Sequence, residues 1–335
     1  MTTTPTNAGS THAAGAHSKT PEGMLRTKDT SDISEIQGER PLVWVNGQLV
    51  PKGEARVSVF DHGLLYGDGV FEGIRVYNGK IFKSKQHMDR LYECARRIRL
   101  DIHISPDEME QIQRRCIEAN EIVNGYIRLI VTRGEGSLGL NPFACPEAGI
   151  ICIADQIALY PPKMYEEGMR VVIAERPRIP IECLDPRIKS LNYLNNILAK
   201  IEAIDAGCLE CIMLNMSGDV AECSGDNIFV VKDGELFTPP TDACILEGIT
   251  RRFVMDTLAP DCGIRCTEKT ITPQDIFDAD ELFLTGSAAE IIAVTKIGKT
   301  EEDAAVIGTG HEGEVTNKLR MRFREIVTSD HVPED

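Results

Sequence analysis

The sequence predicts an α+β protein of two domains, a small N-terminal α/β domain and a larger barrel-like α+β domain. The length of 335 residues suggests about two domains, each large enough to bury a core. In the first half, strands joined by hairpins are followed by helices that cluster together. In the second half, many short, irregularly spaced apolar runs favour a barrel-like sheet over a doubly wound one.

Composition divides the chain into four segments. Residues 1–39 are rich in Thr, Ala, Gly, Ser and His with almost no apolar periodicity, so we expect a disordered tail. Residues 40–155 are expected to form the small domain and residues 166–330 the large domain. The linker between them, 156–165, is marked by Tyr160-Pro161-Pro162, because proline continues neither a strand nor a helix.

Two Asn-Gly pairs predict β-hairpins in the small domain, because these residues adopt the positive φ of tight two-residue turns. They are Asn46-Gly47 and Asn78-Gly79, each between apolar runs. Ser105-Pro106 is a helix start signal. The other elements expected here are helices at about 84–99 and 106–120 and strands at 125–132 and 149–154.

The large domain is expected to begin with a strand and to end with a helix. Between them, one helix follows Lys189 and another follows Gly248-Ile249-Thr250. The expected strands are 170–174, 211–215, 227–231, 235–238 and 281–285, and the expected helices are at about 191–206, 251–258 and 315–327.

Charge and composition argue against several classes of function. A net charge of −16 and a pI near 5.0 disfavour nucleic-acid binding, which depends on cationic contacts to phosphate, and favour small-molecule partners. No apolar run approaches the roughly 18 residues of a membrane helix, and the N-terminus lacks the pattern of a secretory signal. The 11 cysteines, an odd count without framework spacing, therefore favour reduced thiols in a cytoplasmic protein.

Two short motifs suggest other chemistry but lack the context that it requires. Gly134–Gly139 matches G-x-G-x-x-G after an expected strand, yet Pro142 and Pro146 come where a dinucleotide fingerprint needs a helix. Cys208-x-x-Cys211 has no second cysteine pair at a spacing suited to zinc. We therefore expect a loop at the first motif, structural cysteines at the second and no metal site.

Several separated segments carry residues suited to cofactor chemistry. In chain order they are YGDGVFEGIR (66–75), HMDRL (87–91), YIR (126–128), KSLNY (189–193), AECSGDN (221–227), LEGITR (246–251) and TGSAAE (285–290). Together they resemble the class IV aminotransferases, the fold-type IV pyridoxal 5'-phosphate (PLP) enzymes, and within them the branched-chain amino acid aminotransferases. The resemblance spans roughly residues 41–328.

The resemblance implies a cofactor site around Lys189, which would carry PLP and act as general base and acid once the substrate displaces it. Glu222 would pair with the pyridine nitrogen and keep it protonated, and Tyr193 would bond the cofactor's O3'. Taken alone, these residues suggest less: a lysine with its amine in solvent, a surface glutamate beside a turn and a core tyrosine.

The resemblance also implies a phosphate site. Gly248, Ile249 and Thr250 precede an expected helix, whose first amides and the Thr250 hydroxyl can bind an anion. Arg90 would reach the same phosphate through charge-assisted hydrogen bonds. Ser287 stands where the family often has threonine and keeps the hydroxyl. Without the resemblance, Thr250 is an ordinary N-cap and Arg90 a solvated helix arginine.

The implied substrate pocket combines aromatic and cationic residues. Aromatic side chains give an apolar slot for leucine, isoleucine and valine, and Arg128 would bind the second carboxylate of glutamate or 2-oxoglutarate. In this family a dimer interface completes the pocket, so a homodimer or a higher homo-oligomer is implied. The expected pocket residues are Tyr66, Phe71, Arg75, Tyr126, Arg128, Ser287 and Ala288.

The implied activity is reversible, ping-pong transfer of the amino group of L-leucine, L-isoleucine or L-valine to 2-oxoglutarate. D-amino acid aminotransferase, aminodeoxychorismate lyase and R-selective amine aminotransferases share the fold and would use Lys189 and Glu222 in the same way. The segments 71–75 and 126–128 favour the branched-chain group. A nucleotide- or thiol-dependent oxidoreductase and a non-catalytic binding protein of the same fold are the more distant alternatives.

Overall fold

The computed structural model describes residues 33, 36, 38–157 and 160–335. Most of the expected N-terminal tail therefore lies outside the described residues. Of the part that is described, Ile33 and Ile36 pack against the core of the first domain. Within the described ranges, no helix has the length and apolar character needed to span a bilayer.

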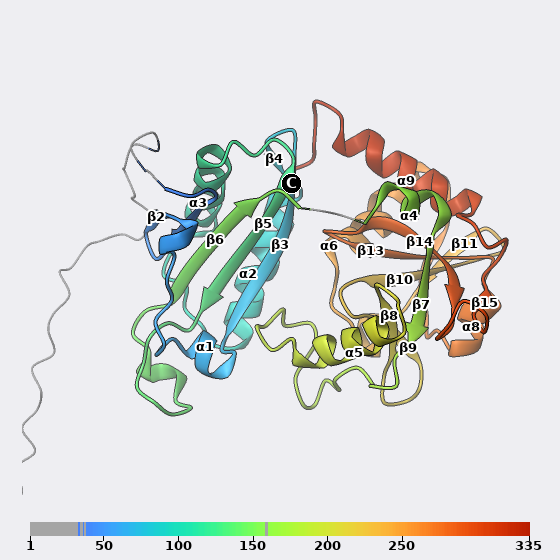
Figure 1. Ribbon diagram of the computed structural model, residues 1–335, viewed down its shortest axis with the longest axis horizontal. Coiled ribbons are helices and arrows are strands. Elements are labelled where there is room, and N and C mark those ends of the chain that lie inside the picture. The colour runs from blue at the N-terminus through green and yellow to red at the C-terminus, as the bar shows by residue number, and fades with distance from the viewer. Residues whose placement is uncertain (1–32, 34–35, 37, 158–159) are drawn as a thin grey trace, which may run out of the picture.

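The first domain is built on a six-stranded antiparallel sheet in the order β2-β1-β6-β5-β3-β4 (Figure 1). Both expected Asn-Gly hairpins are confirmed, since Asn46-Gly47 joins β1 to β2, Asn78-Gly79 joins β3 to β4, and φ is positive at all four residues. The strands are β1 (Leu42–Val45), β2 (Gln48–Pro51), β3 (Gly69–Tyr77), β4 (Lys80–Ile81), β5 (Gly125–Thr132) and β6 (Gly149–Asp155).

Helices α2 (Ser84–Arg97) and α3 (Pro106–Ala119) cover one face of this sheet and share its apolar core. The start of α3 is fixed by a capping box, in which Ser105 and Glu108 each accept the other's backbone N–H. A short helix, α1 (His62–Tyr66), begins at Asp61, whose side chain accepts the N–H of Gly63. The expected helices and strands of this domain are thus confirmed.

The alternation of side chains along β3 assigns each residue to one of the two faces of the sheet. Val70 and Ile74 point into the core under α2 and α3. Phe71 and Arg75 therefore point the other way, where they contact Tyr193 and Glu290 of the second domain. All nine residues of β3 are buried, so both faces of this strand are covered.

The second domain contains a nine-stranded mixed sheet, ordered β12-β11-β10-β13-β14-β7-β8-β9 with β15 beside β14. Its two ends approach each other, because Val220 in β9 donates to the carbonyl of Ile271 just after β12. The sheet is therefore curled, as the barrel-like prediction requires. The strands are β7 (Met169–Ile173), β8 (Cys211–Leu214), β9 (Val220–Cys223), β10 (Asn227–Lys232), β11 (Glu235–Thr238), β12 (Cys266–Glu268), β13 (Glu281–Gly286), β14 (Glu290–Ile297) and β15 (Ala305–Val306).

Three consecutive helical segments of this domain form one continuous run, which begins at Ile249. α6 (Ile249–Phe253), the π-helical segment η5 (Val254–Leu258) and α7 (Ala259–Asp261) follow one another without a break. The first helix of this domain, α4, begins at Pro162, inside the segment expected as a linker. Proline is compatible with the first turn of a helix, where its missing N–H is not needed. The remaining helices are α4 (Pro162–Glu167), α5 (Leu194–Asp205), α8 (Pro273–Phe277) and α9 (Glu314–Val327).

The two short motifs behave as expected. After Gly139 the chain forms only a 3-10 turn, Pro142–Ala144, so no helix offers its N-terminus to a dinucleotide. Cys208 and Cys211 are buried in an apolar cluster, and burial raises the pKa of both thiols. Neither motif has the setting of a nucleotide or redox site.

Contacts at the C-terminal side hold the two domains together. After α9 the chain returns to the first domain, where Pro333 and Glu334 accept the backbone N–H groups of Lys83 and Lys85 at 2.8 and 3.0 Å. Val332 is buried in an apolar cluster that contains residues of both domains. The C-terminal residues lie beside β4 (Figure 1).

Candidate active site

Lys189 lies between the domains, in a segment that pairs with β3. The Lys189 carbonyl accepts the Phe71 N–H and the Gly69 carbonyl accepts the Leu191 N–H, both at 3.0 Å, around a bridge between Val70 and Ser190. Because this backbone is occupied by β3, helix α5 begins at Leu194 rather than near 191 as expected. The lysine is therefore presented from a bridged loop segment rather than from a helix.

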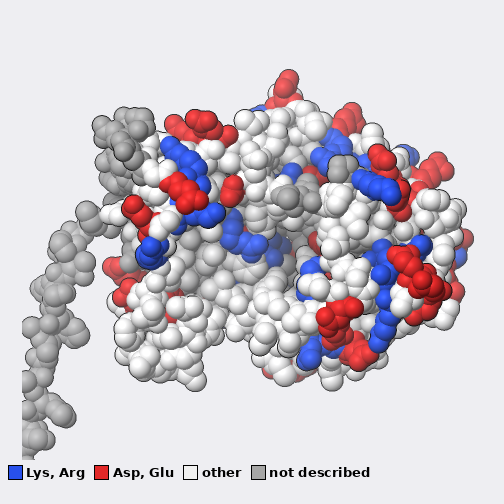
Figure 2. All heavy atoms as spheres, viewed as in Figure 1, with Lys and Arg blue, Asp and Glu red and all other residues white. Residues whose placement is uncertain are grey.

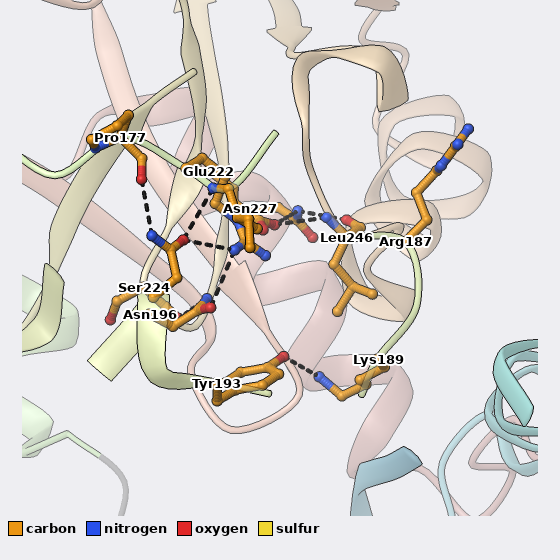
Figure 3. A network of polar contacts seen from close by, with 12 residues as sticks. Pro177, Arg187, Lys189, Tyr193, Asn196, Glu222, Ser224, Asn227 and Leu246 are labelled. Atoms are coloured by element: carbon orange, nitrogen blue, oxygen red, sulfur yellow. Dashed lines mark hydrogen bonds and ion pairs between the residues drawn. The ribbon is translucent and has the colours of Figure 1, made fainter. Parts of the chain in front are cut away.

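The side chain of Lys189 meets two of the predicted residues. Its Nζ donates to the Tyr193 hydroxyl at 3.1 Å (Figure 3) and lies 4.6 Å from the centre of the Phe71 ring. The Phe71 and Tyr193 rings contact each other edge to face, with 4.9 Å between the ring centres. The structure thus brings the lysine, a hydroxyl and an aromatic wall together.

Glu222, on β9, is buried and accepts three hydrogen bonds. Its Oε1 accepts from Arg178 Nε at 2.8 Å, and its Oε2 accepts from Asn227 Nδ2 at 3.1 Å and the Leu246 N–H at 3.0 Å (Figure 3). Burial raises the pKa of the Glu222 carboxyl, while the charges of Arg178 and Lys189 oppose that rise. A carboxylate is therefore held in one orientation near the lysine.

Sequence reasoning missed Arg178. It is buried, and besides Glu222 its guanidinium contacts the side-chain oxygens of Asn195 and Asn196 at 3.1 and 3.2 Å. In the sequence it stands between two prolines, Pro177 and Pro180, where an arginine suggests a solvated loop. No local signal could have found it, because its partner lies 44 residues away.

Gly248, Ile249 and Thr250 form the start of the helical run 249–261. Gly248 is its N-cap in extended conformation and uses no side chain, so the first amides of the run are not capped by that residue. A Cβ at Gly248 would lie 2.0 Å from Asn227 Oδ1, so only glycine fits this close approach. Thr250 is buried next to it. The turn offers amides and a hydroxyl to an anion.

Arg90 reaches this turn from α2 in the other domain. Its Nη1 donates to the carbonyl of Glu247 at 2.7 Å, one residue before Gly248. Its Nε and Nη2 each donate to the carboxylate of Glu72 at 2.7 Å. The arginine is thus fixed with its guanidinium against the start of the helical run.

The turn between β13 and β14 carries Ser287 and Ala288. Gly286 and Glu290 form the last pair of this hairpin, so residues 287–289 make its tip. The neighbouring Thr285 Oγ1 is buried and has no hydrogen-bond partner among the described residues. A buried hydroxyl without a partner suits a site where a polar ligand binds.

The face of the small sheet opposite the core holds four of the predicted pocket residues. Arg128 lies 4.7 Å from the Phe71 ring centre and donates to the Tyr126 hydroxyl at 3.3 Å. A Cβ at Gly73 would lie 1.8 Å from that hydroxyl, so glycine leaves the room that Tyr126 needs. Arg75 is buried beside Glu290, and its Nε and Nη1 have no hydrogen-bond partner in the described part of the chain.

Tyr66 is placed differently. It is 37% exposed on α1, its hydroxyl accepts the Gly139 N–H at 3.0 Å, and its ring packs against His62. Within the described ranges, none of these contacts is with another predicted pocket residue.

Figure 2 shows Lys and Arg side chains along the hollow between the domains, although the net charge of the chain is −16. A local excess of positive charge there suits phosphate and carboxylate groups.

A family model, amino-transferase class IV, matches residues 69–297, more than half of the chain. The chain belongs to the class IV aminotransferases. It is therefore a PLP-dependent transaminase, and the family resemblance of its sequence is confirmed.

Several class IV relatives cover nearly all of the chain. A Methanocaldococcus jannaschii protein with the provisional name branched-chain-amino-acid aminotransferase is 47% identical over 286 residues, which is 85% of this chain and 96% of that protein. The Pseudomonas aeruginosa branched-chain-amino-acid aminotransferase is 36% identical over 292 residues (86% and 93%). The Listeria monocytogenes D-alanine aminotransferase is also 36% identical, over 288 residues (85% and 96%).

Solved class IV structures confirm the fold. The Escherichia coli branched-chain amino acid aminotransferase superposes with a TM-score of 0.82 at 33% identity, covering 87% of this chain and 95% of that one. The T.th. branched-chain amino acid aminotransferase complexed with N-(5'-phosphopyridoxyl)-L-glutamate gives 0.80 at 35% identity (88% and 95%). The predicted two-domain α+β fold of type IV is thereby confirmed.

The residues present in this class IV chain fit PLP. A phosphate needs amides, a hydroxyl and a cation, and the turn at Gly248–Thr250 with Arg90 offers all three. A pyridine ring needs a buried acid, and Glu222 is one. Thr285, whose buried Oγ1 has no partner among the described residues, pairs across the sheet with Asn227, which donates to Glu222.

A second buried acid of this class IV site, Asp226, predicts a pH-dependent stability. Burial and the charge of Glu210 raise the pKa of Asp226 to about 7. Because the unfolded carboxyl ionises near its ordinary pKa, the contribution of Asp226 to the free energy of unfolding is largest at low pH and falls as pH rises toward 7. Asp226→Asn removes that loss and is expected to stabilise the protein at about pH 8 by on the order of 3 kcal/mol.

Thermal or denaturant unfolding at about pH 8 and about pH 5 checks this expectation, since the gain at pH 5 should be much smaller. A gain that is equal at both pH values would contradict the ionisation of Asp226 as its cause.

Proposed function

We propose that the protein is a branched-chain amino acid aminotransferase. It transfers the amino group of L-leucine, L-isoleucine or L-valine reversibly to 2-oxoglutarate by ping-pong chemistry with PLP. The observation that carries the proposal is Arg128 over Phe71 beside Tyr126, because it joins an aromatic slot to a cation in one pocket. An apolar side chain can fill the slot, and an acidic one can reach the guanidinium.

PLP, when bound, supplies an electron sink for the charge that develops at the substrate α-carbon. In the proposal, Lys189 carries the cofactor, and its Nζ takes the proton from the substrate α-carbon. The Tyr193 hydroxyl, 3.1 Å from that amine, would orient it and would bond the cofactor's O3'. Glu222 would pair with the pyridine nitrogen, and Arg178 keeps the carboxylate in place.

The proposed phosphate site is the start of the helical run. The amides of Gly248, Ile249 and Thr250 and the Thr250 hydroxyl would hold the phosphate. Arg90 comes from the small domain and Ser287 from the hairpin tip. In this assignment residues 166–330 form the PLP-binding domain, while residues 40–155 hold the substrate pocket and contribute one cofactor ligand.

The proposed substrate site spans both domains. Phe71, Tyr126 and Arg128 line the side-chain end, and the Ser287-Ala288 turn binds the substrate carboxylate through its amides. Arg75 adds a buried positive charge next to this turn through its contact with Glu290.

A homodimer would explain the position of Tyr66. Several apolar residues on α1 and in the loop after Gly136 are exposed, and Tyr66 is hydrogen-bonded to this loop at Gly139. A second copy of the chain that covers these residues would also bury Tyr66. We therefore place Tyr66 in the pocket of a homodimer or a higher homo-oligomer. The exposed apolar residues are Leu64, Leu65, Leu138, Leu140 and Phe143.

The cellular location is proposed to be the cytoplasm.

A substrate panel with both enantiomers tests the function. We expect L-leucine, L-isoleucine and L-valine to donate to 2-oxoglutarate with parallel double-reciprocal plots, because in a ping-pong reaction the first product leaves before the second substrate binds. D-alanine serves as the control donor, since a D-alanine aminotransferase is 36% identical to this chain. A preference for D-alanine, or release of pyruvate from aminodeoxychorismate, would reassign the protein within the family.

A further inference from the structure

Glu72 is a fully buried acid that the proposed chemistry does not use. It lies on β3 directly after Phe71, and the alternation of the strand turns it to the opposite face, between Val70 and Ile74. A carboxylate among such apolar neighbours persists only when it is paired and hydrogen-bonded. Glu72 is paired on both of its oxygens.

Two residues of α2 supply those partners. Arg90 donates from Nε to Oε1 and from Nη2 to Oε2, both at 2.7 Å, and His87 Nδ1 lies 2.8 Å from Oε2. His87 and Arg90 are three residues apart, so they share one face of the helix. Burial lowers the pKa of His87, which is consistent with a neutral ring that donates Nδ1–H.

The pairing with Glu72 determines which N–H groups of Arg90 remain available to a ligand. The Glu247 carbonyl accepts from Nη1, so three N–H groups of the guanidinium are used in this structure. One N–H is left on each of the two terminal nitrogens. They belong to a guanidinium held against the turn at Gly248–Thr250, with its side chain 12% exposed. The arginine is thus oriented before any ligand arrives.

From this geometry we propose that Glu72 and His87 are positioning residues that hold Arg90 for the phosphate of the cofactor. Glu72 fixes the plane of the guanidinium, and His87 fixes the carboxylate. The inference rests on the proposed phosphate role of Arg90. Affinity for the phosphate then depends on Glu72 and His87, which lie on the core side of the sheet and would not touch the cofactor.

Binding of PLP and of pyridoxal, which lacks the phosphate, separates positioning from general packing. The cofactor-free protein is titrated with each compound, and binding is followed by absorption or fluorescence. In Glu72→Gln we expect the Kd of PLP to rise by about tenfold or more, because a charge-assisted contact loses its fixed geometry. The Kd of pyridoxal is expected to change by less than about twofold, because that compound does not use Arg90.

His87 provides a milder pair of variants that retain the Arg90–Glu72 ion pair. His87→Leu removes the donor to Glu72 and is expected to weaken PLP binding selectively. His87→Asn places an amide N–H near the position of Nδ1–H and is expected to restore most of the affinity. This pair keeps the test informative if Glu72→Gln does not fold.

Asp68→Asn is a matched control. Asp68 makes a two-point ion pair with Arg133 at 2.9 Å in the same domain, and neither residue belongs to the proposed phosphate site. Equal loss of PLP and pyridoxal affinity in the Glu72 and His87→Leu variants, or no loss of either, would overturn the positioning role. A wild-type protein that binds no PLP would contradict the proposed function itself.

Discussion

Replacing Lys189 by alanine is expected to abolish transamination and to remove the absorption band of the lysine-bound cofactor. The amine has two proposed tasks, covalent attachment and transfer of the α-proton, and no other described lysine amine contacts Phe71 or Tyr193. Loss of a positioned general base alone lowers the rate by roughly 10²- to 10⁴-fold, and the loss of attachment adds to it. Steady-state rates with L-leucine and the absorption spectrum measure both effects.

The matched control is Lys163→Ala, because Lys163 is 77% exposed on α4 and pairs only with Glu167 among its described contacts. It should leave the rate and the spectrum unchanged. A small primary amine added to Lys189→Ala is expected to restore part of the rate, since it can take the proton in place of Nζ. A Lys189→Ala protein that keeps the absorption band and the wild-type rate would contradict the proposed role of this lysine in cofactor attachment and proton transfer.

Glu222→Gln is expected to lower kcat by roughly 100- to 1000-fold while changing the Kd of PLP much less. The amide keeps the shape of the side chain but removes the negative charge that would hold a proton on the pyridine nitrogen. The proposed phosphate contacts, which would anchor the cofactor, lie elsewhere, at Gly248–Thr250 and Arg90. Rates under saturating PLP and equilibrium binding of PLP separate the two quantities.

The same substitution also leaves Arg178 as a buried guanidinium without a charged partner, which is expected to cost about 3–5 kcal/mol of unfolding free energy. Glu312→Gln is the control, because the side chain of Glu312 is only 6% exposed and makes a two-point ion pair with Arg320, at 2.6 and 2.8 Å. It should lose stability and keep its kcat. Equal losses of kcat and PLP affinity in Glu222→Gln would contradict the role given to the charge.

Local signals in the sequence were sufficient for much of the fold. Asn46-Gly47 and Asn78-Gly79 determine their turns through backbone preferences of the residues themselves, and Ser105 with Glu108 closes its capping box within four residues. These interactions involve chain neighbours, so a sequence pattern can reveal them. The separated motifs, taken as a family resemblance, added the order of the site residues.

Long-range pairings were beyond such signals. β3 is buried on both faces, so its sequence has no apolar-polar alternation that would show Phe71 facing the pocket and Glu72 facing α2. The cationic partners of Glu222 and Glu290 also come from other segments of the chain, Arg178 for the first and Arg75 and Arg324 for the second. Tertiary packing decides these contacts, and no local composition encodes them.

The backbone ladder between β3 and the Lys189 segment has a mechanical consequence. Two main-chain hydrogen bonds, one from Lys189 and one from Leu191, attach this segment to the strand that carries Phe71, so the backbone of the lysine and this wall of the pocket are tied together. Swinging the domains apart would have to break these bonds, whereas a rearrangement of the Ser287-Ala288 tip would not. The spacing between the Lys189 backbone and Phe71 is therefore set by a short β-bridge that joins the two domains.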